Sequence, residues 1–223
     1  LKKAGKKIYK FGFGQSPFPI PDSIILALKN SANKNTYLPM QGLEELRKAI
    51  ANHLNESNGN SFESDDIVVG PGTKELMFLT QIAFNGDILL PAPSWVSYHP
   101  QALIAKNKVY WIQTDSNTNW FPTAKQIEDK IKTIKNKNLL LFLNSPNNPS
   151  GTVCENLKEI ASIAKKYKLI ILSDEIYSRL TFDKRYLSIS NFYPEGTIIS
   201  TGLSKWCGAG GWRLGFFAIP NQL

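Results

Sequence analysis

The stretch of the chain that decides the fold is residues 139–151, which read LLLFLNSPNNPSG. Its first five residues are all apolar, so a strand formed by them has no side that suits water. Such a strand is typical of a parallel sheet that helices cover on both faces. The asparagines, prolines and glycine that follow favour a turn. We therefore predict an internal strand of an α/β sheet over residues 139–143.

Outward from this strand, apolar β-rich runs alternate with amphipathic helical patterns. Further strands are predicted over residues 67–69, 87–90, 108–112, 169–172, 197–201 and 215–219. Helices are predicted over residues 43–55, 74–85, 95–106, 124–135 and 157–168, one of them opened by a capping box of Thr123 and Gln126. The last strand follows Arg213 too closely for a helical crossover, so we expect it to be antiparallel. The fold class is α/β, with a doubly wound, mainly parallel seven-stranded sheet.

Residues 1–30, which include Pro17, Pro19 and Pro21, do not fit this alternation. We expect them to form an N-terminal arm that belongs to a second, smaller domain. Residues 31–223 would then form a large domain that is incomplete at its C-terminus. The chain does not begin with methionine and ends at Leu223, soon after the last predicted strand, so we expect it to be a fragment of a longer protein.

The composition excludes several classes of protein. The net charge of +8 comes from 22 lysines and 4 arginines that are scattered along the chain without a nucleic-acid-binding motif. No apolar stretch is long enough to span a membrane. Two cysteines are too few for a disulfide framework, which indicates a reducing compartment. We expect a cytoplasmic protein that binds neither nucleic acid nor a membrane.

Chemically distinctive residues follow the ends of five predicted strands. These stretches are GPGTK at 70–74, PAPSW at 91–95, NSPNNPSG at 144–151, SDEIY at 173–177 and GLSKWCGAGGWRLG at 202–215. In an open α/β sheet, ligands bind beyond the carboxyl ends of the parallel strands. We therefore predict that these five stretches form one site.

Two of the stretches suit an anion. Gly72, Thr73 and Lys74 open a predicted helix, whose free N–H groups favour a negative charge, although an ordinary glycine turn would look the same. In the last stretch Lys205 offers a nucleophilic amine, and Arg213 offers a fork suited to phosphate. The spacing fits neither a Walker A loop nor a dinucleotide-binding fingerprint.

The other stretches offer partners for a charged aromatic ligand. Asp174 lies at the end of a very apolar strand, where an acid needs a cationic partner, unless it caps a helix. Tyr177 lies three residues further on, and Asn148 belongs to an Asn-Pro-Ser-Gly turn that needs no function to explain it. Trp95 has a ring that can stack on a ligand or lie in the core.

The ordered combination of the Asn148 turn, the Asp174–Tyr177 pair and the Ser204-Lys205 to Arg213 run resembles the class I/II aminotransferases. These are pyridoxal phosphate (PLP) enzymes of fold type I, similar to aspartate aminotransferase, and the resemblance covers essentially the whole chain. It implies a PLP-dependent aminotransferase that moves an amino group between an amino acid and a 2-oxo acid.

The resemblance also implies a role for each matching residue. The catalytic residues would be Lys205, which forms the internal aldimine (Schiff base) with PLP, Asp174, which pairs with the pyridine nitrogen, and Tyr177. Asn148 and Tyr177 would contact the ring hydroxyl, and Trp95 would stack on the ring. The phosphate would be held by Gly72, Thr73, Lys74, Ser204, Arg213 and by Tyr37 of a neighbouring subunit, which implies a homodimer with shared active sites. Gly14, Trp95 and Asn148 would bind the substrate, and no metal is expected.

This sequence departs from the family pattern at two points. Many members carry a phosphate-binding serine where this chain has Gly202. The arginine that binds the substrate carboxylate lies in a part of the family that this chain does not include, so the amino donor and acceptor are not identified. Other fold type I PLP enzymes, namely C–S lyases, decarboxylases and cyclases, remain alternatives. So does the PLP-binding domain of a transcriptional regulator, whose DNA-binding module would lie upstream.

Overall fold

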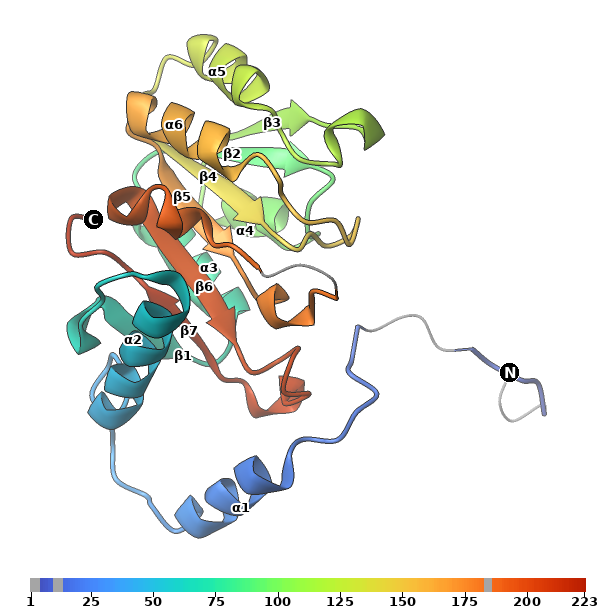
Figure 1. The fold of residues 1–223 in the computed structure, drawn as a ribbon, viewed down its shortest axis with the longest axis vertical. Coiled ribbons are helices and arrows are strands. Elements are labelled where there is room, and N and C mark those ends of the chain that lie inside the picture. Colours follow the sequence, from blue (N-terminus) through green and yellow to red (C-terminus); the bar gives the residue numbers. More distant parts are fainter. Residues whose placement is uncertain (1–4, 10–13, 183–185) are drawn as a thin grey trace.

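The computed structural model of the protein describes residues 5–9, 14–182 and 186–223. Within these residues one sheet of seven strands has the order β1-β7-β6-β5-β4-β2-β3 (Figure 1). Strands β2 to β6 pair in parallel, whereas β7 is antiparallel to both of its neighbours. The predicted fold class and the antiparallel last strand are therefore confirmed. The strands are β1 (Ile67–Gly70), β2 (Asp87–Ala92), β3 (Val109–Gln113), β4 (Leu139–Asn144), β5 (Ile170–Asp174), β6 (Thr197–Gly202) and β7 (Gly215–Ala218).

Helices pack on both faces of the sheet, as the apolar strand β4 requires (Figure 1). They are α1 (Asp22–Ser31), α2 (Glu44–Asn58), α3 (Thr73–Ala83), α4 (Tyr98–Ile104), α5 (Ala124–Lys132) and α6 (Leu157–Tyr167). The five predicted helices are confirmed, although α4 begins later than predicted because Trp95 lies in the turn that precedes it. Helix α1 is not among the helices that the sequence pattern predicts.

Alternate residues of β4 enter different halves of the core. Leu139, Leu141 and Leu143 pack in a cluster with buried residues of α5 and α6. Leu140 and Phe142 pack in a second cluster with buried residues of α3 and α4. A third cluster joins α2 to β1, β6 and β7. Helices thus cover both faces of the sheet, and its carboxyl edge remains accessible to polar residues.

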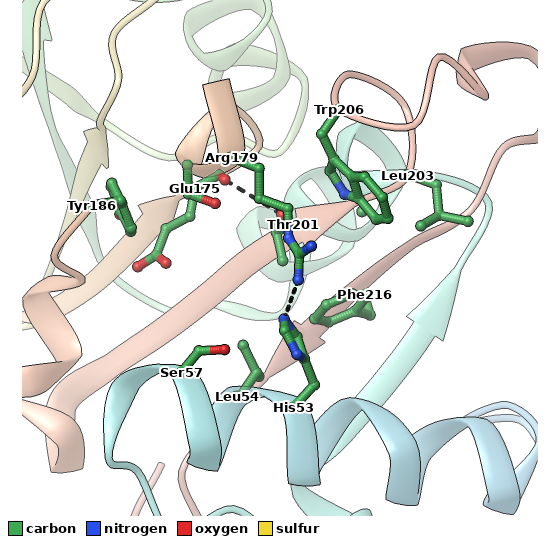
Figure 2. A pocket seen from close by; sticks show the side chains of 12 residues that line it. His53, Leu54, Ser57, Glu175, Arg179, Tyr186, Thr201, Leu203, Trp206 and Phe216 are labelled. Carbon is green, nitrogen blue, oxygen red and sulfur yellow. Dashed lines mark hydrogen bonds between the residues drawn. The ribbon is translucent and has the colours of Figure 1, made fainter. Parts of the chain in front are cut away.

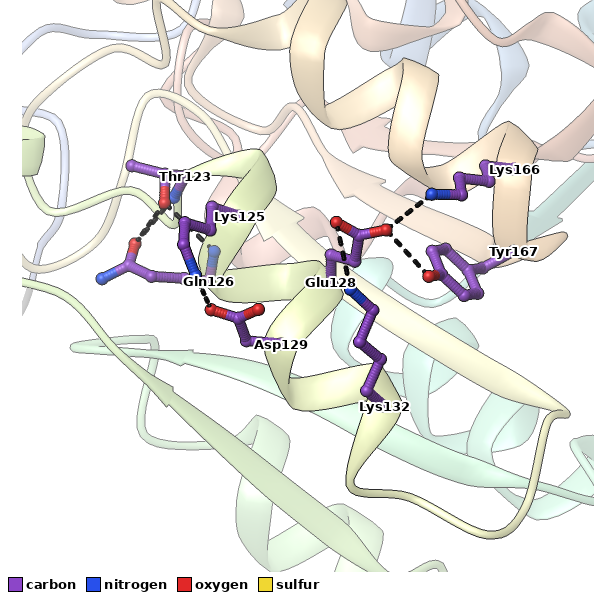
Figure 3. Close-up of polar contacts among 8 residues, drawn as sticks. All are labelled: Thr123, Lys125, Gln126, Glu128, Asp129, Lys132, Lys166 and Tyr167. Atoms are coloured by element: carbon purple, nitrogen blue, oxygen red, sulfur yellow. Dashed lines mark hydrogen bonds and ion pairs between the residues drawn. The ribbon is translucent and has the colours of Figure 1, made fainter.

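The outer surface of α5 and α6 shows where some of the lysines are used (Figure 3). Thr123 and Gln126 form the predicted capping box, which is confirmed. Glu128 of α5 accepts hydrogen bonds from Lys166 Nζ at 2.6 Å and from Tyr167 Oη at 2.8 Å, both at the end of α6. Exposed pairs of this kind each stabilise a fold by no more than about 1 kcal/mol. These lysines therefore belong to a solvated helical surface.

The N-terminal segment stands apart from the sheet in Figure 1. None of the residues of α1 is buried. The chain rejoins the sheet after α1, where the backbone N–H of Val69 donates to the carbonyl of Gln41 at 2.8 Å. The division into an arm (1–30) and a large domain (31–223) stays a prediction, and residues 1–4 and 10–13 of the arm lie outside the described residues. No helix in the described part of the chain is long and apolar enough to cross a membrane.

Candidate active site

Several of the predicted site residues meet beyond the carboxyl ends of β4, β5 and β6. The side-chain amide of Asn148 lies 3.5 Å from the hydroxyl of Tyr177. The amine of Lys205 lies 5.6 Å from the centre of the Tyr177 ring, and it donates a hydrogen bond to the carbonyl of Gly14 at 3.0 Å. The arm, the β4 turn, the β5 end and the lysine loop therefore converge on one place.

Asp174 is the buried acid of this site. It ends β5 beside Asn144 of β4 and Ser200 of β6 in the sheet register, and only 5% of its surface is exposed. Burial raises the pKa of the Asp174 carboxyl to about 6, because water no longer solvates its charge. Hydrogen bonds to the carboxylate and the positive charge of Lys205 act in the opposite direction. The acid is thus placed where a cationic ligand group would stabilise its ionised form.

The two oxygens of Asp174 have different donors. Oδ2 accepts a hydrogen bond from the hydroxyl of Tyr98 at 2.6 Å, and Oδ1 accepts one from the backbone N–H of Ile176 at 3.3 Å. Burial and the nearby Asp174 charge raise the pKa of Tyr98 well above its ordinary value, so its hydroxyl keeps its proton and acts as a donor.

A second group of predicted residues forms a place for an anion at the start of α3. Gly72 has a φ of +93°, and a Cβ added to it would lie 2.2 Å from Nη2 of Arg213. Only glycine fits there, because its backbone conformation is left-handed and the guanidinium lies directly against it. Arg213 Nη1 donates to the carbonyl of Gly210 at 2.7 Å, which fixes the guanidinium. Gly72 is the N-cap of α3 and offers no side-chain cap, so the first N–H groups of the helix are left for a ligand.

Trp95 connects the two groups. Its ring lies edge-on to the ring of Tyr98, with centres 5.4 Å apart. The ammonium of Lys74 lies 5.8 Å from the centre of the Trp95 ring, and its side chain is exposed at the start of α3. Thr73 is half-buried beside Lys74 in the first turn of the same helix.

The structure gives a physical reason for Gly202, at the position where the resemblance leads us to expect a serine. A Cβ at this position would lie 2.6 Å from the carbonyl oxygen of Leu214 and 2.8 Å from Cα of Gly215. A serine here would therefore push the backbone of β7 away from β6. Ser204, two residues later, is half-buried next to Lys205, and its hydroxyl forms no hydrogen bond to the described residues.

Tyr37 is not brought to the site. Its side chain is fully exposed, with a relative exposure of 105%, on the segment between α1 and α2. In the described part of the chain it has neither a hydrogen bond nor a ring contact. Its predicted role needs a second subunit, and it stays a prediction.

Sequence analysis did not identify two residues that organise this site. Tyr98 holds Asp174 directly, as described above. Asn144 donates from Nδ2 to the carbonyl of Asp174 at 2.9 Å, and its Oδ1 accepts from the N–H of Asn148 at 2.7 Å. Sequence analysis could have considered Tyr98, because it follows the strand end that carries Trp95 and because the hydroxyl of a buried tyrosine usually has a hydrogen-bond partner.

A cavity of about 280 Å³ lies on the α2 side of β6 (Figure 2). Its lining includes His53, Leu54, Glu175, Arg179, Thr201 and Trp206. The guanidinium of Arg179 lies 4.6 Å from the ring centre of Trp206, and Nη2 of Arg179 lies 2.5 Å from Nε2 of His53. Lys205, Tyr177 and Asn148 are not part of its lining, so this cavity is distinct from the site that holds Asp174.

The residues that face the sheet edge fit the PLP that the resemblance implies. The tight contact of Arg213 with Gly72 forms a cradle for a phosphate, and the buried Asp174 carboxylate suits a cationic ring nitrogen. The amine of Lys205 lies between the Tyr177 ring and the carbonyl of Gly14, where it can reach a carbonyl carbon of a ligand. In the described residues no group of three or more His, Cys, Asp or Glu side chains could hold a metal ion.

Comparisons with known proteins show that this chain is similar to aminotransferases. A probable aspartate aminotransferase of Methanocaldococcus jannaschii is 35% identical over 219 residues, which is 95% of this chain and 57% of that protein. An aspartate aminotransferase of Thermus thermophilus, solved with maleate, superposes with a TM-score of 0.91 at 28% identity, over 98% of this chain and 58% of that one. An aromatic aminotransferase of Pyrococcus horikoshii superposes with a TM-score of 0.86 at 33% identity, over 95% and 59% of the two chains.

The chain thus spans a little over half the length of the relatives it matches. The sequence profile of one family, described as aminotransferase class I and II, matches residues 6–223. With nearly every residue of the chain inside that match, the protein belongs to the class I and II aminotransferase family.

Proposed function

We propose that this chain is the cofactor-binding part of a PLP-dependent aminotransferase that moves an amino group between an amino acid and a 2-oxo acid. The observation that carries the proposal is the placement of three groups at one edge of the sheet. These are the amine of Lys205, the buried carboxylate of Asp174 and the Arg213–Gly72 contact at the start of α3. They match the aldehyde, ring nitrogen and phosphate of PLP, the cofactor on which this family depends.

The cofactor supplies an electron-withdrawing ring that stabilises negative charge at the carbon next to the amino group of the substrate. Asp174 keeps the proton on the ring nitrogen, because a buried carboxylate is stabilised by a cation beside it. Lys205 would be the covalent anchor for PLP, and once its amine is freed by the incoming amino acid it would act as the base that removes the proton from Cα. The ring centre of Tyr177 lies 5.6 Å from that amine.

The remaining residues orient the ligands. Asn148 and Tyr177, whose polar groups are 3.5 Å apart, donate to the ring hydroxyl. Trp95 stacks on the ring, and Arg213 with Gly72, Thr73, Lys74 and Ser204 binds the phosphate. The carbonyl of Gly14 accepts a hydrogen bond from the amine of Lys205. The N-terminal arm would therefore lie beside a substrate that reacts at this amine. The named relatives are aminotransferases, so the alternatives of a lyase, decarboxylase, cyclase or regulator gain no support from them.

We further propose that the active protein is a homodimer with shared active sites. The side chain of Tyr37 is fully exposed on the segment between α1 and α2, where it is free to reach the phosphate site of a second copy. The unpaired cysteines Cys154 and Cys207 are both buried, and they support a reducing, cytoplasmic location.

Covalent labelling tests the proposed function. The protein is incubated with PLP and reduced with borohydride, and the modified lysine is located by peptide mass spectrometry. We expect the label on Lys205, no yellow absorbance or label in the Lys205→Ala variant, and full labelling in a Lys158→Ala control on the exposed side of α6. A label spread over surface lysines, or unchanged in Lys205→Ala, would contradict the proposal. Transamination with several amino donors is then measured on the protein expressed from its complete reading frame.

A further inference from the structure

Tyr98 is a buried residue to which the family resemblance assigns no role. It is the first residue of α4, and only 1% of its surface is exposed. Its ring packs against Phe142 and Trp95, with centres 4.8 and 5.4 Å away. The hydroxyl of Tyr98 lies beyond these rings and donates a hydrogen bond to Oδ2 of Asp174 at 2.6 Å. Phenylalanine would pack equally well there, so the hydroxyl has a reason beyond filling space.

The hydrogen bond limits how the Asp174 carboxylate can turn. A terminal carboxyl torsion is broad and has no strong preference of its own. Here Tyr98 holds Oδ2 from the α4 side, while the N–H of Ile176 holds Oδ1 from the backbone at a longer 3.3 Å. Since each carboxylate oxygen can accept more than one hydrogen bond, both keep capacity for a ligand. The bond to Tyr98 is the shorter of the two and the only one from a side chain among the described residues.

The same bond acts on the charge of Asp174. The titratable groups close enough to interact electrostatically with this carboxyl are Tyr98 from α4, Glu175 and Tyr177 from the segment after β5, and Lys205 from the loop after β6. Burial disfavours the ionised carboxyl, whereas the Tyr98 hydroxyl donates to it and the Lys205 ammonium attracts it. Loss of the hydroxyl would therefore shift Asp174 toward its protonated form, which cannot pair with a cationic nitrogen.

We propose that Tyr98 is a positioning residue that holds the Asp174 carboxylate ionised and in one orientation, ready for the ring nitrogen of PLP. Tyr98 touches neither the substrate nor the reacting atoms and acts only through Asp174. The inference deepens the proposed function, because it rests on Asp174 being the partner of the cofactor ring.

Two matched variants separate this role from packing. Tyr98→Phe removes the hydroxyl and keeps the ring. Tyr167→Phe is the control, since Tyr167 also donates to a carboxylate, that of Glu128 at 2.8 Å, on the outer surface of α5 and α6 (Figure 3). Tyr98→His offers a ring N–H in place of the hydroxyl and serves as the rescue variant. If Tyr98→Phe does not fold, Tyr98→Leu, which also lacks a donor, takes its place.

The first measurement needs no cofactor. The Asp174 carboxyl carbon is followed by ¹³C NMR between pH 3 and 9 in protein labelled at aspartate, and its signal is assigned by its absence in Asp174→Asn. We expect the midpoint to rise by about one pH unit in Tyr98→Phe, to stay unchanged in Tyr167→Phe and to return toward the original value in Tyr98→His. An unchanged midpoint in Tyr98→Phe would overturn the proposal.

The second measurement uses the PLP-loaded protein from the complete reading frame. Tyr98→Phe should lower kcat about tenfold or more with little change in KM, and it should shift the pH at which the absorbance of bound PLP changes. An equal loss in Tyr98→Phe and Tyr167→Phe would mean a general structural effect and would also overturn it. If the unsubstituted protein did not bind PLP, the proposed function would fail, whereas the carboxyl titration would still decide whether Tyr98 controls Asp174.

Discussion

Asp174 and Glu175 are successive residues at the end of β5, and both carboxyls are buried. They point to opposite faces of the sheet. Asp174 meets Tyr98 of α4 beside Lys205, whereas Glu175 lines the cavity next to α2 (Figure 2). Burial raises the pKa of both carboxyls, to about 6 for Asp174 and about 7 for Glu175. Equal burial therefore does not tell the two acids apart.

Their partners do tell them apart. One oxygen of Glu175, Oε1, accepts hydrogen bonds from the hydroxyls of Ser173 at 2.9 Å and Ser188 at 2.5 Å, and the hydroxyl of Tyr186 is a further donor to this carboxyl. Asp174 has one hydroxyl donor and lies in the field of a lysine. A buried acid whose hydrogen bonds are all supplied by neutral hydroxyls has a structural role. A buried acid with spare acceptor capacity beside an amine is suited to a ligand.

The largest expected effect is on chemistry, from Asp174→Asn. In the proposed function the Asp174 charge keeps the ring nitrogen of PLP protonated. Its removal should therefore lower the rate of amino transfer by several powers of ten, with each ~1.4 kcal/mol of lost stabilisation costing tenfold. PLP should still bind through Lys205 and the phosphate contacts. The rate is measured by single-turnover kinetics on the protein from the complete reading frame, and binding by absorbance.

Glu175→Gln is the control for that experiment. It should lower stability and change the rate far less than Asp174→Asn does. If both variants slowed amino transfer equally, the distinction between the two acids would be wrong. Near-normal turnover in Asp174→Asn would mean that another group protonates the ring.

The second prediction concerns the pH dependence of stability without cofactor. Ordinary pKa values are 3.8 for Asp174 and 4.5 for Glu175, and the folded values are about 6 and about 7. At these two carboxyls the folded chain thus holds more protons than the unfolded chain in this window, so their contribution to stability should be greatest near pH 4 and fall as the pH rises to 7. His53, whose pKa is lowered by burial and by Arg179, acts with the opposite sign below pH 6.5. Glu175 alone accounts for roughly 3 kcal/mol, at about 1.4 kcal/mol per pH unit.

Urea unfolding at several pH values measures this loss. Glu175→Gln should flatten most of the slope between pH 4 and 7, and Asp174→Asn should flatten only the part below pH 6. Glu128, whose pKa is lowered from 4.5 to about 2 by Lys166 and Tyr167, acts with the opposite sign up to about pH 5. It is present in every variant, so the change in slope between variants reports on the two buried acids. A stability that is level from pH 4 to 7 in the unsubstituted protein would contradict the burial argument.

The sequence alone predicted the sheet because its signal is local. Residues 139–143 are apolar throughout, and a short run of this kind followed by turn residues is typical of an internal strand. The position of Asp174 at a strand end could be predicted for the same reason. Its partner could not, because Tyr98 lies 76 residues away in the sequence. The tight packing of Gly202 against Leu214 and Gly215 likewise depends on how β7 turns back along β6. Helix α1 was missed because none of its residues is buried, so no core constrains its pattern.

The smallest expected effect comes from Ser188→Ala, on the Glu175 side of the comparison. Ser188 is fully buried, and its loss would leave Glu175 with one donor fewer, at a cost of about 1–3 kcal/mol. The loss of stability should grow above pH 7, where Glu175 is ionised and needs its donors most, and shrink near pH 4.

The control is Ser150→Ala, which removes a half-buried hydroxyl bonded to Thr152 at 2.7 Å. It should lower stability little at either pH. Urea unfolding at pH 4.5 and pH 8 distinguishes the two variants. A cost for Ser188→Ala that did not change with pH would mean that Ser188 stabilises the fold through its contacts with Ser190, and that Glu175 is held by Ser173 and Tyr186 alone.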